Sequence, residues 1–593
     1  MSLFSPQPVK LSAEMRRVRA IPRRELADEE QAQPWIEEYT SRFALAGAVS
    51  KGMAVNWPQA VSLHEATANP CGALFQLPVG TGKTLTAEWL PLVIAAESKR
   101  LGRPVKAVLI TDASLKTKTF KDRQSFKGVW RIAAPPPRII TREELALEQN
   151  ALLLQEIDPD ILILDECDGL SNFDASAPQK IHRFLYPQAL QKPGQKTPVR
   201  RPGKRCFAMT GTLSRRSIMN YWHTLVWCLG DGTPVPLIRA EAETWAGVID
   251  DAAPRGGWRP KPGALGDSLD AARTWYLERL ASTPGVVLID EDSAAHVPLT
   301  IHVELAPECP ALTEAFDQLR MFWKSPGGEP VTDTLSLLRL EGQLGTGLYT
   351  YFDPPPPQAW AEARSDLAKF IRARIAATRH AYKPLDTGAQ VMRAHPSHPV
   401  VAAWKAIKDT YDPKAHARVE WLSTVTLEWC KGWLLREDEP SVLWCGGVEF
   451  GERLARELKV PYYGPRGREA RTGRELTDAK PVGRDSHIVC SWHANKRGFN
   501  LQGWARQGIV QPPQSSKYVE QIIGRGHRQG QKNGVHFTWL ATSGGTLDSF
   551  TAMMREAAFV RDTSKLTQKI LRAEIADIPL PPPSLRWATK DED

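Results

Sequence analysis

The segment GALFQLPVGTGKT, residues 72 to 84, decides the fold class of this 593-residue chain. A short apolar run typical of a β-strand comes first, a glycine turn follows, and LTAEWLPLVIAA then continues with helical periodicity. A strand, a glycine turn and a helix in this order are the setting of a phosphate-binding loop. The strict loop pattern has glycine at position 77, where this chain has Leu77. The segment predicts a parallel-sheet α/β domain with a nucleotide site.

The loop residues have separate expected roles. Glycine lets backbone N–H groups converge on phosphate oxygens at the positive end of a helix. Lys83 is expected to reach the β- and γ-phosphates of a nucleoside triphosphate, and Thr84 to ligate Mg²⁺. Gly80, Thr81 and Gly82 complete the expected nucleotide-binding loop. The predicted ligands are therefore ATP and Mg²⁺.

A second segment, DPDILILDECDGL at residues 158 to 170, supplies the carboxylates that such a site needs. Its unbroken apolar run predicts a central parallel strand buried on both faces, and α/β sheets place their ligands at the carboxyl ends of such strands. Asp165 and Glu166 follow the run and are expected to point to opposite sides of it. We assign Mg²⁺ to Asp165 and the orientation of water to Glu166. An ordinary acidic turn after a strand is the alternative interpretation.

A third segment, EQIIGRGHRQGQK at residues 520 to 532, is not explained by local stability. Gly524 and Gly526 interrupt it, and each costs a helix interior up to about 1 kcal/mol relative to alanine. Gln521, Arg525 and Arg528 have the spacing i, i+4 and i+7, which places them on one face if the segment is helical. Arginine presents a rigid fork of donors that suits phosphate or carboxylate. We expect the two arginines to hold an anion; the alternative is a surface salt-bridge network.

The composition indicates a soluble protein with two or more domains. A chain of 593 residues exceeds what one hydrophobic core usually organises. The net charge of +9 favours a polyanionic partner. The eight cysteines include no C-x-x-C pair, which favours reduced thiols in the cytoplasm. The first residues lack the apolar core of a signal peptide, and no later run has the length needed to cross a bilayer, so no membrane role is expected.

Together these segments resemble the motifs of superfamily 2 helicase-type ATPases, and most of all the Snf2-like branch. LPVGTGKT is similar to motif I, and DECD to motif II. MTGTLSRRSIMNYWHTLVWCLG, from Met209, resembles motif III, with Leu213 where that branch usually has proline. KRGFNLQGW, from Lys496, resembles motif V, and QIIGRGHRQGQ, from Gln521, resembles motif VI. The motifs follow the family order over roughly residues 50 to 560.

The resemblance implies a role for each motif. In this family motif VI lies on a second domain and faces the nucleotide held by the first. Gln59 would read adenine, and Gln521 would contribute to the nucleotide site. The implied catalytic residues are Lys83, Asp165, Glu166, Arg525 and Arg528. The residues implied to couple hydrolysis to movement are Thr210, Gly211, Thr212, Gly498 and Asn500.

Strand-like runs alternate with helical stretches in two parts of the chain. The first set is KAVLITDAS, RIITREEL, ILILDE and CFAMTGT, and the second is SVLWCGG, SHIVCSW, QGIVQPP and VHFTWLAT. With the resemblance, they imply an α/β fold class: two RecA-like parallel-sheet domains in tandem with an inserted helical subdomain. The expected parts are an N-terminal extension (1–51), a first RecA-like domain with motifs I to III (52–235), a mostly helical insertion (236–398), a second RecA-like domain with motifs IV to VI (399–560) and a C-terminal tail (561–593).

Two basic segments are candidates for contact with nucleic acid. The stretch from Lys192 to Arg205 has six Lys or Arg residues, no acid, and enough Pro and Gly to be an exposed loop. A predicted helix at 358–382 carries five Lys or Arg residues against two acids, although a solvated surface is the commoner fate of such a face. The resemblance adds one residue of motif Ia and one of motif V. The predicted contacts are Lys116, Lys192, Lys196, Arg200, Arg201, Lys204, Arg205 and Arg497.

The implied function is a DNA-stimulated ATPase that moves along double-stranded DNA. Two alternatives stay open. A strand-separating DNA or RNA helicase would need a wedge element, which the sequence does not identify. A non-catalytic nucleic-acid-binding recruitment module is opposed by the intact set of motif residues. No nuclease or methyltransferase pattern stands out, so a nuclease or a replication or recombination protein is the expected partner for chemistry on the DNA.

Overall fold

The computed structural model divides into two compact units. It describes residues 11–78, 80–97, 103–187, 197–213, 216–251, 263–290, 297–331, 333–378, 385–495, 499–513, 515–528 and 530–576. Unit 1 is Met1–Ser293 with Glu556–Gln568, and unit 2 is Ala294–Arg555 with Lys569–Asp593. Each unit is built on a large parallel sheet, so the α/β class is confirmed. No helix in these ranges is long and apolar enough to span a membrane.

Unit 1 contains a six-stranded parallel sheet with the order β3-β2-β4-β5-β1-β6. The five predicted strands of this region, β1 to β5, are confirmed, and β6 was not predicted. The strands are β1 (Gly72–Gln76), β2 (Ala107–Thr111), β3 (Arg138–Thr141), β4 (Ile161–Leu164), β5 (Arg205–Thr210) and β6 (Val286–Leu288).

Both faces of this sheet are covered. Along β4, Leu162 and Leu164 join one apolar cluster, whereas Ile161 and Ile163 join another, because successive strand residues point to opposite faces. The helices that provide the cover are α2 (Gln33–Phe43), α3 (Ala46–Val49), α4 (Trp57–Glu65), α5 (Lys83–Glu97), α6 (Lys116–Phe126), α7 (Arg142–Ala146), α8 (Leu153–Ile157), α9 (Ser176–Leu185), α10 (Trp222–Leu229), α11 (Arg239–Ile249) and α12 (Leu269–Ala281).

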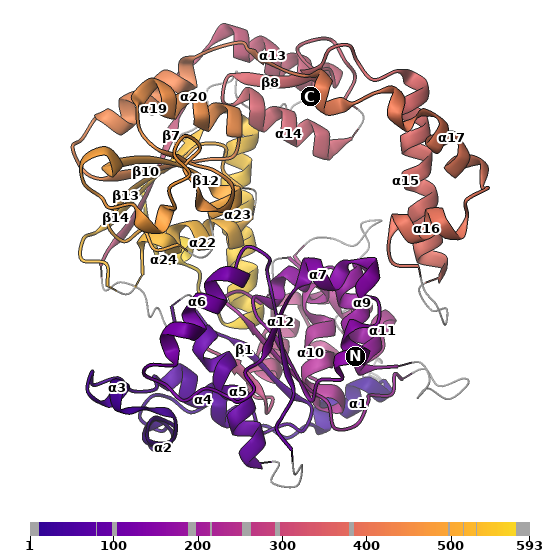
Figure 1. Cartoon of the computed structure of the whole chain (residues 1–593), viewed down its shortest axis with the longest axis vertical. Coiled ribbons are helices and arrows are strands. Elements are labelled where there is room, and N and C mark those ends of the chain that lie inside the picture. The colour runs from indigo at the N-terminus through magenta and orange to yellow at the C-terminus, as the bar shows by residue number, and fades with distance from the viewer. Residues whose placement is uncertain are drawn as a thin grey trace, which may run out of the picture. The chain divides into compact units, whose positions relative to one another are not determined.

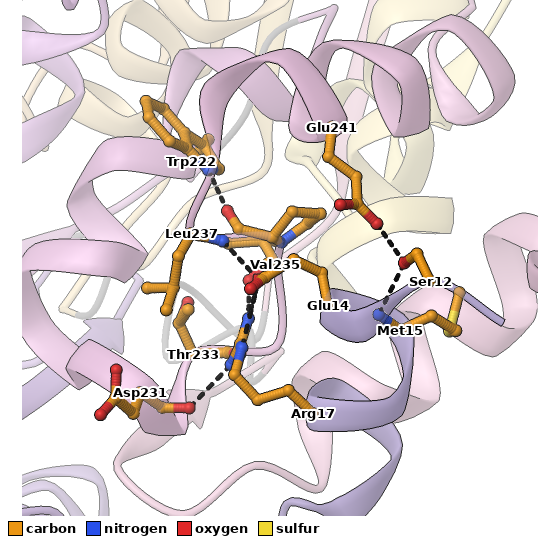
Figure 2. Close-up of polar contacts among 11 residues, drawn as sticks. Ser12, Glu14, Met15, Arg17, Trp222, Asp231, Thr233, Val235, Leu237 and Glu241 are labelled. Carbon is orange, nitrogen blue, oxygen red and sulfur yellow. Dashed lines mark hydrogen bonds and ion pairs between the residues drawn. The ribbon is translucent and has the colours of Figure 1, made fainter. Parts of the chain in front are cut away.

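The first helix, α1 (Ala13–Ala20), docks on unit 1 and is part of it, although the sequence suggested a separate extension (Figure 2). Arg17 donates hydrogen bonds of 2.6 to 2.8 Å to three backbone oxygens in the segment 231–235. Glu14 pairs with Arg17 at 2.9 Å and accepts a hydrogen bond from the N–H of Leu237 at 2.8 Å. The helix therefore fixes the segment that leads from α10 to α11.

Unit 1 is completed by a segment far along the chain, Glu556–Gln568. This segment contains the last part of α23 (Gly544–Ser564). Phe559 is buried in an apolar cluster of unit 1. Gln76, the last residue of β1, donates from its side-chain Nε2 to the backbone oxygen of Ser564 at 2.8 Å. Residues 561–568, which were expected to belong to a C-terminal tail, are therefore part of unit 1 and contact the end of β1.

Unit 2 contains a seven-stranded parallel sheet with the order β11-β12-β10-β13-β14-β7-β15. Four of its strands, β10, β12, β13 and β14, match the predicted runs. The strands are β7 (Leu299–Leu305), β10 (Ser441–Cys445), β11 (Tyr462–Tyr463), β12 (His487–Ser491), β13 (Arg506–Ile509), β14 (Val535–Ala541) and β15 (Glu574–Ile575). The other helices of the unit are α19 (Val425–Leu435), α20 (Val448–Leu458), α21 (Trp492–Asn495), α22 (Ser516–Gly526) and α24 (Lys569–Arg572), together with α13 (Pro310–Phe322) and α14 (Thr334–Leu344), which form an apolar cluster of their own.

An additional module leaves unit 2 through a two-stranded antiparallel ribbon, β8 (Leu348–Phe352) and β9 (Ala417–Trp421). In Figure 1 its helices α15, α16 and α17 lie together, away from β10, β12 and β13 of the same unit. The helices of the module are α15 (Gln358–Thr378), α16 (Gly388–Ala394), α17 (Pro399–Ile407) and α18 (Pro413–His416). The helix predicted at 358–382 corresponds to α15.

The units divide the chain differently from the expected domains. Residues 236–290 belong to unit 1, because β6 pairs with β1. The strand β7, within the expected insertion, pairs with β14 over seven residues. The inserted helices therefore follow the first strand of the second sheet in the chain and belong to unit 2. They do not form a separate linker between the two sheets. The sequence patterns of these two strands are weak, because β6 has only three residues and β7 is partly exposed.

Candidate functional site

Three loops of unit 1 leave the same edge of the sheet from neighbouring strands. In the sheet β5 lies between β1 and β4, with Gln76 beside Thr210 and Leu164 beside Ala208. The strands are parallel, so the phosphate-binding loop, the Thr210–Thr212 turn and the Asp165–Glu166 pair all follow carboxyl ends. Parallel α/β sheets bind ligands at this edge. The topology thus gathers three motifs that together span more than 100 residues of the sequence, from Lys83 to Thr210.

The departure from the strict loop pattern at Leu77 has a structural reason. The Leu77 N–H donates to the Thr210 oxygen at 2.9 Å, and its side chain is fully buried. The residue therefore extends the pairing of β1 by one position, and the turn begins after it. Gly80 and Gly82 have φ angles of 103° and 83°, which residues with a side chain rarely adopt. Both glycines are required by the backbone of the turn.

Lys83 begins α5, and its ammonium group lies against its own loop. Nζ donates to the backbone oxygens of Leu77 at 3.0 Å and Pro78 at 3.1 Å. The Thr81 hydroxyl donates to the Pro78 oxygen at 2.9 Å. Thr84 is the next residue of the helix and is half-buried. A cation held by neutral carbonyl oxygens at a helix N-terminus gains when phosphate oxygens replace them, so the donor set suits a nucleotide phosphate.

Gln59, at the start of α4, lies beside this loop. Its Nε2 donates to the Gly82 oxygen at 3.3 Å, and its Oε1 accepts from the Asn56 N–H at 3.1 Å. Asn56 caps α4 and donates from Nδ2 to the Thr81 oxygen at 3.2 Å. Sequence reasoning missed Asn56, although Asn-x-x-Gln is a capping-box pattern.

The carboxyl pair follows β4. Burial, together with the neighbouring Glu166 carboxylate, raises the pKa of Asp165 from 3.8 to about 6, and the positive charge of Lys83 opposes the rise. The hydroxyl of Thr111, at the end of β2, donates to Asp165 Oδ2 at 3.4 Å. Glu166 is half-buried and has a left-handed backbone with φ 48°. A buried acid beside a lysine and a more exposed acid are suited to different roles.

The turn after β5 connects to the second motif. The Thr210 hydroxyl accepts from the Thr212 N–H at 3.1 Å and lies 3.4 Å from Asp168 Oδ1. Gly211 lies between the two threonines, both of which are buried. The sequence analysis did not single out Asp168, although it belongs to the DECD string. This contact gives a direct path from the turn to the carboxyl segment.

The expected metal ligands, Thr84 and Asp165, do not form a preassembled cage. In the described part of the chain no group of three or more His, Cys, Asp or Glu residues could hold a metal ion. Mg²⁺ commonly binds through one or two carboxylates together with substrate phosphates and water. One carboxylate and one hydroxyl fit that pattern.

The motif VI residues lie in unit 2 at the end of α22. Arg525 is buried, donates from Nη1 to the Phe499 oxygen at 3.0 Å, and donates from Nε to the Gln521 oxygen at 3.0 Å. Gln521 is also buried. Arg525 therefore ties α22 to the motif V segment. In that segment Asn500 is exposed and donates from Nδ2 to Gln502 Oε1 at 2.8 Å; Arg497 and Gly498 lie outside the described residues.

Arg528 is not on the helical face that the spacing predicted. The helix α22 ends at Gly526, and His527 leaves the helical conformation with ψ 85°. Arg528 is half-buried, and burial lowers the pKa of its guanidinium. Within the ranges that the structure describes, this guanidinium has no ion pair. A partly desolvated arginine in this state is ready to accept an anion.

The basic stretch before β5 has a different place from the one its composition suggested. Arg200 is half-buried and donates to the backbone oxygens of Trp227 at 2.6 Å and Cys71 at 3.1 Å. The other described members pair with acids at 2.7 to 3.2 Å: Arg201 and Lys204 with Asp158, and Arg205 with Glu97. Lys192 and Lys196 lie outside the described residues. Because these residues precede β5, they lie at the sheet edge opposite the phosphate-binding loop, and Arg200 has a structural role.

Lys116, the first residue of α6, is also engaged. Its Nζ lies 2.5 Å from Glu144 Oε1, and this hydrogen bond lowers the pKa of Glu144. A contact with a nucleic-acid backbone would have to compete with this pair.

No protein-family model matches the chain, and no curated protein matches it in sequence.

Proposed function

We propose that this protein is an ATP-dependent DNA translocase of the Snf2-like branch of superfamily 2, in which ATP hydrolysis drives movement along double-stranded DNA. One observation carries the proposal. The phosphate-binding loop, the Thr210–Thr212 turn and the Asp165–Glu166 pair converge at the carboxyl edge of one parallel sheet. The strand order and the glycine angles of the loop support a RecA-like assignment of unit 1, and the second parallel sheet supports the same assignment of unit 2.

Each residue of the edge has a role in the proposed reaction. Lys83 exchanges its two carbonyl partners for phosphate oxygens of ATP. Thr84 and Asp165 would hold Mg²⁺, which would neutralise charge on the phosphates. Glu166 orients the attacking water and accepts its proton. Thr210, through its contact with Asp168, transmits the state of the carboxyl segment to the turn after β5.

We assign Arg528 as the arginine that stabilises charge on the transferred phosphoryl group. Its guanidinium is half-buried without an ion pair in the described residues, so an incoming phosphate would supply the missing anion. This role requires the two units to meet around ATP. An arginine used in this way contributes a rate factor of about 10³ to 10⁵. Arg525, with its backbone partners in unit 2, positions the segment that carries Arg528.

The net charge of +9 supports a polyanionic partner, and the family resemblance favours duplex DNA. The eight free cysteines support a reducing compartment, the cytoplasm.

The decisive experiment measures ATP hydrolysis by the full chain without nucleic acid and with single-stranded DNA, duplex DNA or RNA. Duplex DNA should give the largest stimulation. Lys83→Ala should abolish hydrolysis, whereas Lys127→Ala, at an exposed lysine of the same unit, should not change it. Displacement of a third strand from a triplex, without separation of the underlying duplex, would demonstrate translocation. Hydrolysis that is absent, or that Lys83→Ala leaves unchanged, overturns the proposal.

A further inference from the structure

We propose that residues 353–416 of unit 2, the arm, bind the phosphate backbone of duplex DNA. The inference rests on the proposed function and extends it, because it assigns a DNA contact to a part of the chain that contains none of the motifs. Four features of its described residues carry it: the attachment of the arm, its own core, its charges without ion pairs and the absence of exposed rings.

The arm is attached at a defined place. Phe352 pairs with Ala417 at the end of the ribbon of β8 and β9, and the arm begins and ends next to this pair. At the base of the ribbon Tyr349 is buried in a cluster with α13 and α14, and its hydroxyl donates to Glu420 Oε2 at 2.6 Å. The ribbon therefore holds the arm on unit 2 through packed and hydrogen-bonded side chains.

The arm has a small core of its own. The ring of Trp360 lies 5.4 Å from those of Trp404 and Tyr411, and its Nε1 donates to the Lys408 oxygen at 3.3 Å. The other buried apolar side chains are Leu367, Val391 and Val401. The helices α15 and α17 are thus fixed against each other, and the charges on their surfaces have fixed spacing.

The arm is basic, and much of its positive charge is unpaired. Residues 353–416 contain ten Lys or Arg residues and six Asp or Glu residues, in a chain whose total net charge is +9. Lys369 pairs with Asp366 at 3.2 Å, and Lys408 with Asp409 at 2.7 Å. Five others are exposed and have no ion pair in the described part of the chain: Arg364, Arg372, Arg374, Lys405 and Lys414.

This state differs from that of the basic stretch before β5. There, Arg200 is bound to carbonyl oxygens, and Arg201, Lys204 and Arg205 are paired with acids. Binding of a phosphate to those residues would first break existing contacts. Binding to the five residues of the arm breaks no ion pair in the described part of the chain, so the counterion release that is the main source of affinity for DNA is not offset by a lost pair. Their other contacts are weaker: Arg364 and Arg374 lie over the rings of Trp360 and Phe370, and Arg372 Nε donates to the Ala368 oxygen at 3.2 Å.

The kind of nucleic acid follows from the aromatic side chains. Single strands are held largely by stacking of bases on exposed rings. In the described residues of the arm no aromatic side chain is exposed, because Trp360 and Tyr411 are buried and Phe370 stacks on His398 at 4.0 Å. The arm therefore offers charge without stacking, which suits the regularly spaced phosphates of a duplex and gives no preference for sequence.

The test compares three variants of the full chain. The arm variant is Arg372→Gln with Lys405→Gln and Lys414→Gln. The charge-matched control removes three exposed bases of unit 1 by Lys51→Gln, Lys127→Gln and Arg131→Gln. The charge-conserving variant is Arg372→Lys with Lys405→Arg and Lys414→Arg. Fluorescence anisotropy measures the affinity for duplex DNA, single-stranded DNA and RNA between about 50 and 200 mM salt.

The arm variant should bind duplex DNA at least about tenfold more weakly, with a salt slope smaller by up to about 2.7, because each lost phosphate contact lowers the slope by about 0.9. The control and the charge-conserving variant should bind as the unmodified chain does. If the arm variant and the control lose the same affinity for duplex DNA, the loss comes from the change in net charge alone, and the inference is overturned. A loss on single strands or RNA equal to that on the duplex would overturn the duplex assignment.

Hydrolysis of ATP without nucleic acid separates this inference from the proposed function. If the chain hydrolyses no ATP but the arm variant loses duplex binding, the arm assignment stands and the translocase proposal fails. If the chain hydrolyses ATP normally and the arm variant binds duplex DNA as the control does, the translocase proposal stands and the arm assignment fails.

Discussion

Replacing Asp165 by asparagine should abolish ATP hydrolysis and also make the protein more stable. The native environment raises the pKa of this carboxyl from 3.8 to about 6, chiefly by burial. A shift of one unit corresponds to about 1.4 kcal/mol, so ionised Asp165 costs the native state about 3 kcal/mol at neutral pH. Asparagine has nearly the same shape and no charge, and it avoids this cost.

The effect depends on pH in a defined direction. The native carboxyl keeps its proton up to about pH 6, whereas the unfolded one loses it near pH 4, so the native state of the unmodified chain loses stability as the pH rises between these values. Above about pH 6 the cost is constant. The advantage of Asp165→Asn should therefore be absent below about pH 4 and should reach up to about 3 kcal/mol at pH 8.

Thermal unfolding of the full chain without nucleotide, followed from pH 4 to pH 8, measures this difference. The unfolding temperature of unit 1 should rise by several degrees at pH 8 in the variant, at about 2 to 4 °C per kcal/mol for a large domain. The matched control is Asp160→Asn. Burial favours the neutral form of Asp160, but the hydrogen bonds and charge of Arg103 lower its pKa, so this variant should be less stable at pH 8 and should lose that deficit in acid. Parallel pH profiles for Asp165→Asn and the unmodified chain would refute the reasoning.

Other substitutions test separate parts of the molecule. Glu166→Gln should abolish turnover but retain ATP, whereas Lys83→Ala should lose ATP affinity as well; equilibrium nucleotide binding distinguishes them, and equal affinities would contradict the assigned roles. Arg528→Ala should lower kcat by about 10³ or more with ATP affinity changed only a few fold, and Arg528→Lys should not restore the rate; an unchanged duplex-stimulated kcat would remove this arginine from the site. Arg200→Ala should destabilise unit 1 by about 1 to 3 kcal/mol in chemical unfolding, because the Trp227 oxygen loses its side-chain donor while the Cys71 oxygen keeps only the N–H of Cys206, and should leave the salt slope of DNA binding unchanged. If Arg200→Ala lowers the salt slope of DNA binding and leaves the stability unchanged, Arg200 contacts DNA and has no structural role.

Sequence patterns predicted the parts of the fold that rest on local signals. The apolar run before Asp165 and the strand–glycine–helix order around Lys83 identified β4, β1 and α5 because burial on both faces leaves a continuous hydrophobic run. The strand β6 was missed because three apolar residues have no detectable period. The edge strand β15, with two residues, gives no signal either.

The site was predicted where residue type alone determines chemistry and missed where geometry does. Asn56 and Thr111 reach the loop and Asp165 through tertiary contacts, which no spacing in the sequence reveals. The same limit applies to Arg200, whose side chain looks like a DNA contact in sequence but is bound to carbonyl oxygens of two other elements. The sequence shows which side chains are positively charged, but not whether an acidic side chain or a backbone carbonyl group already binds them.

The discontinuity of unit 1 also determines when it can be finished during synthesis. The amide of Gln76 bonds to Ser564, which is made 488 residues later. At roughly 5 to 20 residues per second this interval is on the order of 25 to 100 s. Until then the apolar surface that receives Phe559 has no cover. A chain that stops soon after residue 532 would contain every motif of the proposed ATPase, yet the sheet that carries the phosphate-binding loop would lack its last packing element and would be exposed to chaperones and proteases.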